Sequence, residues 1–322
     1  MPMLDMPLHE LRQYKGISPK PHDFDDYWEK ALGDLEAQPD NLELVLSPFQ
    51  TPNAQCFDLY FTGVGGSRIH AKLLKPRHIK GRAPAVLQFH GYSGDCGDWS
   101  SKLSYVSEGF VVAALDCRGQ GGLSEDIASV KGTTQSGMII RGLDDPDNTK
   151  LHYRNVFLDT AQLARIVMGM DEVDETRVGA TGGSQGGALT MACVSLVPSI
   201  NRASSVFPFL SDYRRVWEMD LAEKAYAELK SFFRRFDPRH EREEAIFTKL
   251  GYIDIVNLAP RVQCKVMMAT GLMDDICPPS TQFACFNRLT CEKKHILYPD
   301  FGHEDLPGYN DMTFQYMLEM KA

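Results

Sequence analysis

Short strand-like runs alternate along this chain with segments whose apolar residues recur at helical spacing. The runs that predict buried strands are 84–89, 110–116, 177–181, 203–207, 264–270 and 295–298. Apolar runs of this length are typical of strands that are covered on both faces, as in a parallel sheet. The pattern therefore predicts an α/β fold, with a mostly parallel central sheet and helices on both faces.

The segments around this predicted sheet have other patterns. Residues 24–35 place their aromatic side chains on one side of a helix, which predicts an N-terminal helical extension over about residues 1–40. Residues 43–74 favour antiparallel strands. The charged, helical stretch over about 212–250 predicts a helical lid inserted between two core strands. Its charges are most simply interpreted as a solvated face.

Nothing in the composition divides the chain into separate domains. We find no linker or low-complexity segment, so residues 1–322 are interpreted as a single domain. The net charge of -9 argues against nucleic acid or an anionic membrane as the main partner. No apolar stretch is long enough for a transmembrane helix, and the N-terminus does not resemble a signal peptide. Eight cysteines without a regular framework favour a cytoplasmic protein with free thiols.

One connection is unusually long. After residues 118–122, a polar, glycine-bearing stretch continues to about Asn148, which exceeds an ordinary connection in a compact domain. Such a loop often takes part in binding or assembly. The alternative is a mobile surface loop.

The strongest chemical signal is the sequence Gly-Gly-Ser-Gln-Gly at residues 182–186. It follows the strand-like run 177–181 and precedes a helix-like segment rich in small residues. This context is typical of a nucleophile elbow, a strand-to-helix turn so sharp that the residues two places either side of the serine must be small. Ser184 is therefore the candidate nucleophile. The alternative is an ordinary glycine turn, because glycine and serine are common residues.

A serine nucleophile needs a histidine and an acid, which follow it along the chain in hydrolases of this class. Asp274 comes first after the strand-like run 264–270, and His303 follows the last predicted strand. In these roles His303 takes the Ser184 proton, and Asp274 orients and stabilises the imidazole. Asp275 is a rival for the acid, and Asp274 could instead cap the helix expected near residues 278–280.

The same chemistry requires two N–H donors for the oxyanion. The backbone N–H of Gln185, directly after the nucleophile, is the first. Tyr92, in the glycine-bearing loop after the predicted strand 84–89, is our choice for the second. The alternative for this loop is a turn with no catalytic duty.

No metal site or cofactor is predicted, since the chain contains neither Cys-x-x-Cys nor His-Glu-x-x-His. Cys277 lies close to Asp274 in the sequence, which raises the question of sensitivity to oxidation. A packed, neutral thiol is the simpler interpretation.

Several segments together resemble a known family. Arg-Gly-Gln at 118–120, Gly-Gly-Ser-Gln-Gly-Gly at 182–187 and His-Glu at 303–304 resemble the signature motifs of the acetyl xylan esterase / cephalosporin C deacetylase family. Residues 141–146 and 271–274 are also similar to that family. The resemblance covers essentially the whole chain.

The resemblance implies an α/β-hydrolase that removes acetyl groups from small acetylated sugars, such as xylo-oligosaccharides, and from cephalosporin-type compounds. It implies the same site as the spacing does, and it implies a homohexamer whose active sites face an internal cavity. Arg118 and Gln120 look like residues that brace the site. His152 is a departure, because relatives commonly carry an aromatic residue there. This puts assembly or substrate access in question more than the chemistry. The residues with implied catalytic roles are Ser184, Asp274 and His303 as the triad, with Tyr92 and Gln185 as oxyanion donors.

Two other functions compete with this one. Serine peptidases of the prolyl oligopeptidase type carry a similar elbow, but they usually add a large propeller domain for which 322 residues leave no room. A hydrolase fold that only binds a ligand is the second alternative. It is disfavoured because binding alone needs no proton relay between a serine and a histidine.

Overall fold

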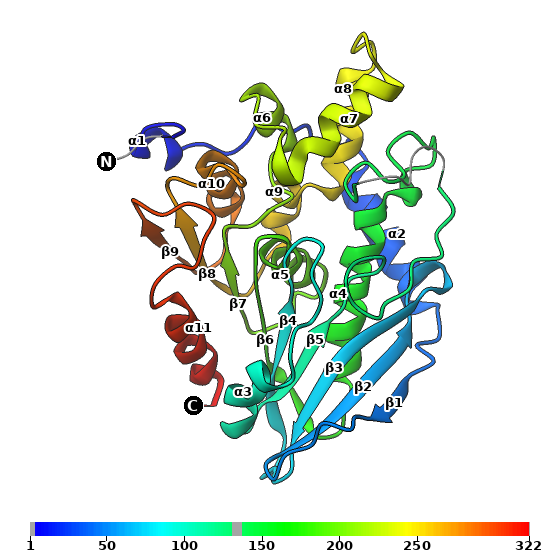
Figure 1. Cartoon of the computed structure of the whole chain (residues 1–322), viewed down its shortest axis with the longest axis vertical. Coiled ribbons are helices and arrows are strands. Elements are labelled where there is room, and N and C mark those ends of the chain that lie inside the picture. The colour runs from blue at the N-terminus through cyan, green and yellow to red at the C-terminus, as the bar shows by residue number, and fades with distance from the viewer. Residues whose placement is uncertain (1–3, 131–136, 322) are drawn as a thin grey trace.

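The computed structural model describes residues 4–130 and 137–321, and its centre is a single nine-stranded sheet (Figure 1). The strands lie in the order β1-β2-β3-β5-β4-β6-β7-β8-β9. Their bounds are β1 (Glu43–Leu46), β2 (Ala54–Thr62), β3 (Arg68–Pro76), β4 (Ala83–Phe89), β5 (Val111–Leu115), β6 (Val173–Gly183), β7 (Arg202–Val206), β8 (Lys265–Gly271) and β9 (Lys293–Tyr298).

The sheet is mixed, with its parallel part in the centre and on one side. Every pairing from β5 through β4, β6, β7 and β8 to β9 is parallel, whereas β1, β2 and β3 pair antiparallel with their neighbours. All residues of β5 are buried, while all residues of the edge strand β1 are exposed. The predicted α/β fold is therefore confirmed, including the antiparallel strands between residues 43 and 74.

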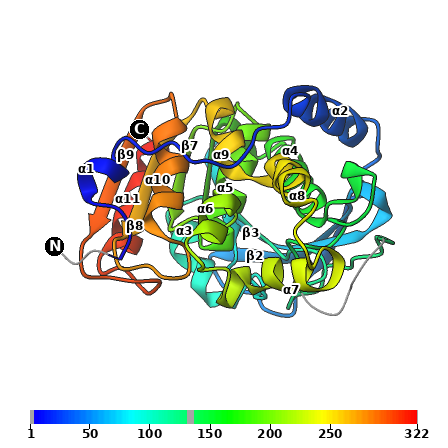
Figure 2. The ribbon, with the colours of Figure 1, turned by 90° about the horizontal axis from the view of Figure 1, so that it is seen from above.

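Helices cover both faces of this sheet. On one face, α3 and α11 pack against the strands, while α4 and α5 cover the other face. Figure 2 shows α2 as an outer layer on α4. The helix bounds are α1 (Leu8–Leu11), α2 (Phe24–Glu36), α3 (Leu103–Ser107), α4 (His152–Met168), α5 (Gln185–Leu196), α6 (Tyr213–Glu218), α7 (Ala227–Phe236), α8 (Glu243–Leu250), α9 (Ile255–Leu258), α10 (Pro279–Arg288) and α11 (Tyr309–Leu318).

The helix α5 is buried on all sides, since every one of its residues is inaccessible. A helix that is apolar all round requires protein on every face. The helix α4 supplies part of this cover and is itself covered by the outer helix α2, since Trp28 stacks on Phe157 of α4 with ring centroids 6.1 Å apart. Its indole N–H also donates to the Tyr252 carbonyl at 3.1 Å. The aromatic side of the predicted helix thus packs inward.

The helices α6, α7 and α8 come between β7 and β8 and lie above the carboxyl ends of the parallel strands (Figure 1). In α7 the side chains of Leu229, Phe232 and Phe233 are buried, whereas Arg234 and Arg235 are exposed. Most charges of this helix therefore do face solvent. That the segment moves as a lid, and that residues 1–322 behave as one domain, stay predictions. The long connection after residue 118 is described except for residues 131–136, which lie outside the described residues.

Two buried carboxyls fasten the N-terminal extension to the segment after β7. Asp212 accepts the Tyr14 hydroxyl at 2.7 Å and the Ser18 N–H at 2.9 Å. Asp254 accepts the N–H of Asp212 at 3.0 Å and the N–H of Val256 at 2.9 Å. Burial, followed by the nearby charge of Asp212, raises the pKa of Asp254 to about 7.

All eight cysteines are free thiols, and seven of them are buried. Among the described helices, none combines the length and the apolar character needed to cross a bilayer.

Replacing Asp254 by Asn should remove a pH-dependent part of the stability. The folded protein holds this proton more tightly than the unfolded chain, in which the pKa is near 3.8. The wild type therefore loses stability as pH rises from about 4 to about 7, and the variant lacks this loss. Urea unfolding at pH about 5 and about 8 checks this. If the difference in free energy of unfolding between wild type and Asp254→Asn is the same at both values, the prediction is wrong.

Candidate active site

The predicted elbow is present between β6 and α5. Ser184 has φ 58° and ψ -120°, a conformation that is costly for a residue with a side chain and is typical of functional sites. A Cβ atom on Gly186 would lie 2.0 Å from the Phe89 carbonyl oxygen, and one on Gly182 would lie 2.5 Å from the Gly186 backbone. Both positions therefore require glycine, which explains the spacing of the motif.

The structure brings together the three residues that the sequence predicted as a triad. His303, on the loop after β9, lies with Nε2 3.0 Å from the Ser184 Oγ. Its Nδ1 lies 2.8 Å from Oδ2 of Asp274, which is on the loop after β8 and is fully buried. Because a carboxylate only accepts hydrogen bonds, Nδ1 is the donor, and Nε2 is left to accept the serine proton.

The surroundings of Asp274 decide between the two candidate acids. Its Oδ1 accepts the N–H groups of Ile276 at 2.9 Å and Cys277 at 2.8 Å, so it orders the loop before α10 while Oδ2 faces the histidine. The capping and catalytic interpretations are therefore compatible. Asp275 is instead half-exposed and pairs with Lys224 at 2.6 Å. Of the two candidates, Asp274 is thus the one hydrogen-bonded to His303.

The two proposed oxyanion donors lie on neighbouring elements. Gln185 is the first residue of α5, and Tyr92 lies in the loop that directly follows β4. Within the described residues, neither backbone N–H donates to another protein group. The first N–H of a helix points out of its N-terminus, where the helix dipole favours negative charge.

Side-chain amides brace these donors. The Gln185 Oε1 accepts the Gln120 amide at 2.9 Å and the Tyr153 hydroxyl at 2.7 Å. The Gln120 Oε1 in turn accepts the Gln185 amide at 3.0 Å and the Ser93 N–H at 2.9 Å. Gln120 thus connects the nucleophile helix to the loop that carries Tyr92, as expected for a bracing residue. The contribution of Tyr153 is not apparent in the sequence.

Arg118 supports the site from a distance. Its guanidinium binds Asp159 of α4 through two hydrogen bonds of 2.7 and 2.6 Å, and both side chains are 1% exposed. Breaking such a buried pair typically costs ~3–5 kcal/mol. The pair joins the start of the long connection to α4.

Two other side chains touch the candidate triad. The Phe207 ring lies against His303 with centroids 4.3 Å apart. Cys277 is buried beside Ser184 and Asp274, and burial together with the Asp274 charge raises the pKa of its thiol well above the ordinary value. The thiol is therefore neutral and packed, in line with the simpler of the two interpretations.

His152 is buried and lies with Nδ1 3.3 Å from an Asp126 carboxylate oxygen. Burial lowers the pKa of this imidazole, and the carboxylate opposes the effect. The residue lies at the start of α4 and forms no contact with the triad among the interactions of the described residues. Its effect on assembly or access stays a question for experiment.

Two groups of described residues bring potential metal ligands within 4.8 Å of one another. One is part of the site itself: Asp274, Cys277 and His303. The other consists of His70, Cys96 and Asp116. In that cluster both ring nitrogens of His70 already face carboxylates, Asp116 at 2.6 Å and Asp58 at 2.9 Å. Hydrogen bonding alone accounts for this geometry.

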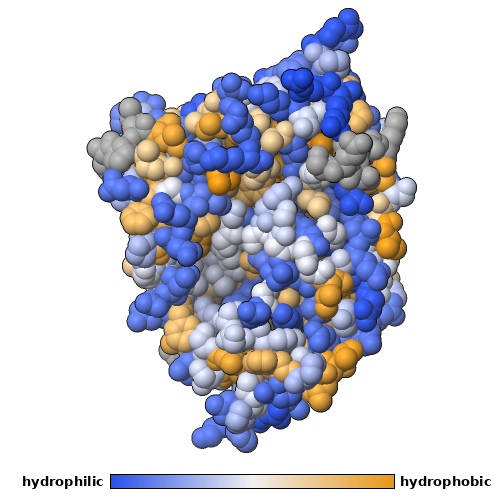
Figure 3. All heavy atoms as spheres, in the orientation of Figure 1, coloured by the Kyte–Doolittle hydropathy of each residue, from blue (hydrophilic) through white to orange (hydrophobic). Residues whose placement is uncertain are grey.

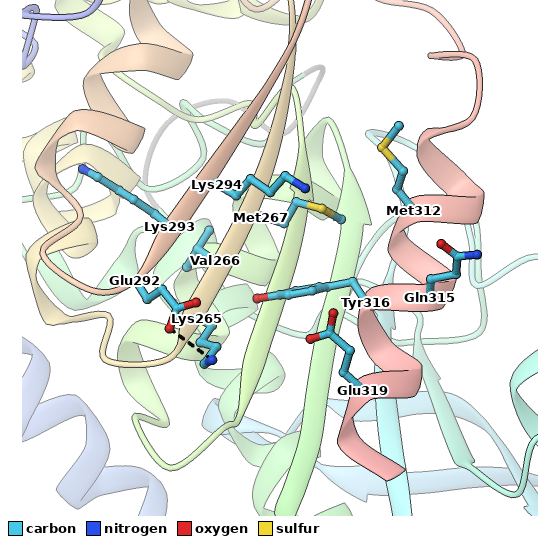
Figure 4. Close-up of a pocket in the computed structure, with 10 residues that line it drawn as sticks. All are labelled: Lys265, Val266, Met267, Glu292, Lys293, Lys294, Met312, Gln315, Tyr316 and Glu319. Atoms are coloured by element: carbon cyan, nitrogen blue, oxygen red, sulfur yellow. Dashed lines mark ion pairs between the residues drawn. The ribbon is translucent and has the colours of Figure 1, made fainter. Parts of the chain in front are cut away.

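A groove of about 330 Å³ lies away from the triad, between the beginnings of β8 and β9 and the helix α11 (Figure 4). Tyr316 crosses it, and Lys265 pairs with Glu292 at its rim at 3.1 Å. The residues of the candidate site follow the opposite, carboxyl ends of these strands. The groove is therefore separate from the chemistry.

Glu228 is a buried residue that the sequence analysis missed. It lies in α7, accepts the Tyr92 hydroxyl at 2.9 Å and accepts the Ile140 N–H at 3.0 Å. Burial raises its pKa to about 7. A charged run predicts a solvated face as a whole and does not reveal which single residue points inward.

The fold and this arrangement of serine, histidine and acid define an α/β-hydrolase. The family model for acetyl xylan esterase (AXE1) matches residues 1–320. The chain therefore belongs to the acetyl xylan esterase family.

Two solved structures and one curated relative agree with this assignment. Acetyl xylan esterase 1 from Thermoanaerobacterium sp. JW/SL YS485 is 54% identical, with a TM-score of 0.98 over 99% of this chain and 100% of that one. The acetyl xylan esterase from Paenibacillus sp. R4 is 35% identical, with a TM-score of 0.92 over 97% of this chain and 99% of that one. The acetyl esterase Axe7A of Xylanibacter ruminicola is 27% identical over 297 residues, which is 90% of this chain. This chain spans 65% of the length of that relative.

Proposed function

We propose that this protein is a serine esterase that removes acetyl groups from small acetylated sugars, such as xylo-oligosaccharides, and from cephalosporin-type compounds. The observation that carries the proposal is the relay from the Ser184 Oγ to His303 at 3.0 Å and on to Asp274 at 2.8 Å. Membership of the acetyl xylan esterase family supports the acetylated sugar. The cephalosporin-type substrate rests on the resemblance of the sequence motifs.

In the proposed mechanism, His303 Nε2 takes the Ser184 proton as Oγ attacks the ester carbonyl carbon. The carbonyl oxygen becomes an oxyanion that accepts the backbone N–H groups of Gln185 and Tyr92. Asp274 stabilises the imidazolium, which then protonates the departing sugar oxygen and leaves an acetyl-enzyme. A water molecule then attacks the acetyl carbon as His303 takes one of its protons, and the imidazolium returns that proton to the Ser184 Oγ as acetate leaves.

The first prediction concerns acyl length. Hydrolysis of nitrophenyl esters from acetyl to octanoyl should fall steeply beyond acetyl, because the family acts on acetyl groups. Ser184→Ala should abolish turnover while the protein stays folded, since alanine lacks the hydroxyl that attacks the ester. A flat profile would indicate a broad esterase, and substantial activity in the variant would reject Ser184 as nucleophile.

The second prediction uses neighbouring acids as a matched pair. Asp274→Asn should lower kcat by about 10⁴-fold, because an amide in place of the carboxylate disfavours the required imidazole tautomer. Asp275→Asn should leave kcat within about twofold, since it loses only a surface ion pair. Steady-state kinetics on nitrophenyl acetate compares the two. Equal effects would contradict the assignment of the acid.

We also propose a homohexamer, as the resemblance implies. The edge strand β1 exposes Leu44, Val45 and Leu46, and Leu42 just before it is also exposed. On the face seen in Figure 3, apolar side chains form separate clusters in a largely hydrophilic surface. An exposed apolar edge strand is a surface that proteins generally cover.

The third prediction is therefore a particle of six chains in solution. Multi-angle light scattering measures its mass against the 36.1 kDa of one chain. Charged substitutions at Leu44 and Leu46 should shift the mass downward if β1 lies in an interface. A monomeric wild type would refute the proposal.

A further inference from the structure

Glu228 lies where a carboxylate is costly. It is in the first turn of α7 and only 6% exposed, and within the described residues it forms no ion pair with a cation. The nearby titratable groups are tyrosines: Tyr92, whose hydroxyl it accepts, and Tyr153 and Tyr213, whose pKa values its charge raises. Replacing a buried charge by an apolar side chain is often neutral or stabilising, so stability alone does not explain it.

The long connection wraps around this carboxylate. Oε2 accepts the Ile140 N–H at 3.0 Å, and the N–H groups of Met138 and Ile139 also face Glu228. Gly137 has φ +91°, and a Cβ atom there would lie 2.2 Å from the same oxygen. The turn at 137–140 is thus shaped to hold a carboxylate.

The other oxygen reaches the proposed oxyanion hole. Oε1 accepts the Tyr92 hydroxyl at 2.9 Å, and the Tyr92 ring packs on Phe209 with centroids 5.7 Å apart. The ring is therefore held by Phe209 and, at its hydroxyl, by Glu228. Since the ring and the backbone N–H belong to one residue, holding the ring restricts the movement of the N–H that is proposed as an oxyanion donor.

We infer that Glu228 is a positioning residue for ester hydrolysis: by holding the Tyr92 hydroxyl, it couples α7 and the turn at 137–140 to the oxyanion donor. The inference rests on the proposed function, in which the Tyr92 N–H stabilises the oxyanion. Such a donor acts on the transition state and not on the bound ester, so misplacing it lowers kcat and leaves KM nearly unchanged.

The test is a double-mutant cycle on nitrophenyl acetate hydrolysis, with active sites counted by the burst of nitrophenol. Tyr92→Phe removes the hydroxyl but keeps the N–H, and Glu228→Leu removes the acceptor at similar volume. Each should lower kcat roughly 10- to 100-fold, which is less than the ~10²–10³-fold loss typical of a removed donor. The kcat of the double variant should be no lower than that of the less active single variant. Glu228→Gln retains one acceptor oxygen, so its kcat should lie between those of the wild type and Glu228→Leu.

The matched control is Glu223→Gln, an exposed carboxyl just before α7, which should leave kcat and KM unchanged. Multiplying effects in the double variant, or a wild-type kcat in Tyr92→Phe, would overturn the inference. If Glu228→Leu fails to fold, Tyr92→Phe and Glu228→Gln still form the cycle.

Hydrogen exchange separates failure of this inference from failure of the proposed function. Amides in 91–94 should exchange faster in Tyr92→Phe and in the Glu228 variants, and not in Glu223→Gln. If the wild type is inactive but the amides in 91–94 exchange faster in the variants, the proposed function is rejected. Glu228 then has only a structural role. If the wild type is active and amide exchange in 91–94 is unchanged in the variants, the inference about Glu228 is rejected. The proposed esterase function is then unaffected.

Discussion

The arrangement of the whole site depends on one close approach of backbone to backbone. The first turn of α5 presses against the end of β4 so tightly that a Cβ atom on Gly186 would lie 2.0 Å from the Phe89 carbonyl oxygen. Phe89 is the last residue of β4, and the loop with Tyr92 begins directly after it. The distance between the two proposed oxyanion donors is thus set by contact between main chains, which cannot relax as a side chain can. Any larger residue would push the nucleophile helix away from the loop.

Buried polar groups, and not apolar packing alone, fix the loops around this contact. The Arg118–Asp159 pair, the facing amides of Gln120 and Gln185, and the carboxylate of Glu228 are each satisfied by specific partners. Apolar side chains tolerate small shifts, whereas a buried hydrogen bond is lost when its partner moves. These groups therefore hold each connecting segment in a single conformation. This is what a site with several loop-borne residues requires.

The central part of the fold and the meeting of Ser184, Asp274 and His303 were predictable because their signals are local or follow chain order. The elbow is encoded in five neighbouring residues, and Asp274 and His303 each follow a recognisable strand. Strand boundaries were less accurate: β6 begins at Val173, which pairs with Ala83 of β4, and not at residue 177. The polar residues 174–176 that follow Val173 gave no strand signal. Glu228 and Tyr153 were missed because their roles depend on contacts with residues far away in the chain. No periodicity carries that information.

The candidate base is attached to the least protected strand of the parallel part. His303 follows β9, which pairs only with β8, forms one edge of the sheet and contains no fully buried residue. The nucleophile instead follows β6 in the middle of the sheet. Edge elements open locally at lower free energy than central ones. Opening of this edge would separate His303 from Ser184 while the core stays folded. If His303 is the base, turnover would then be lost on heating before the protein as a whole melts.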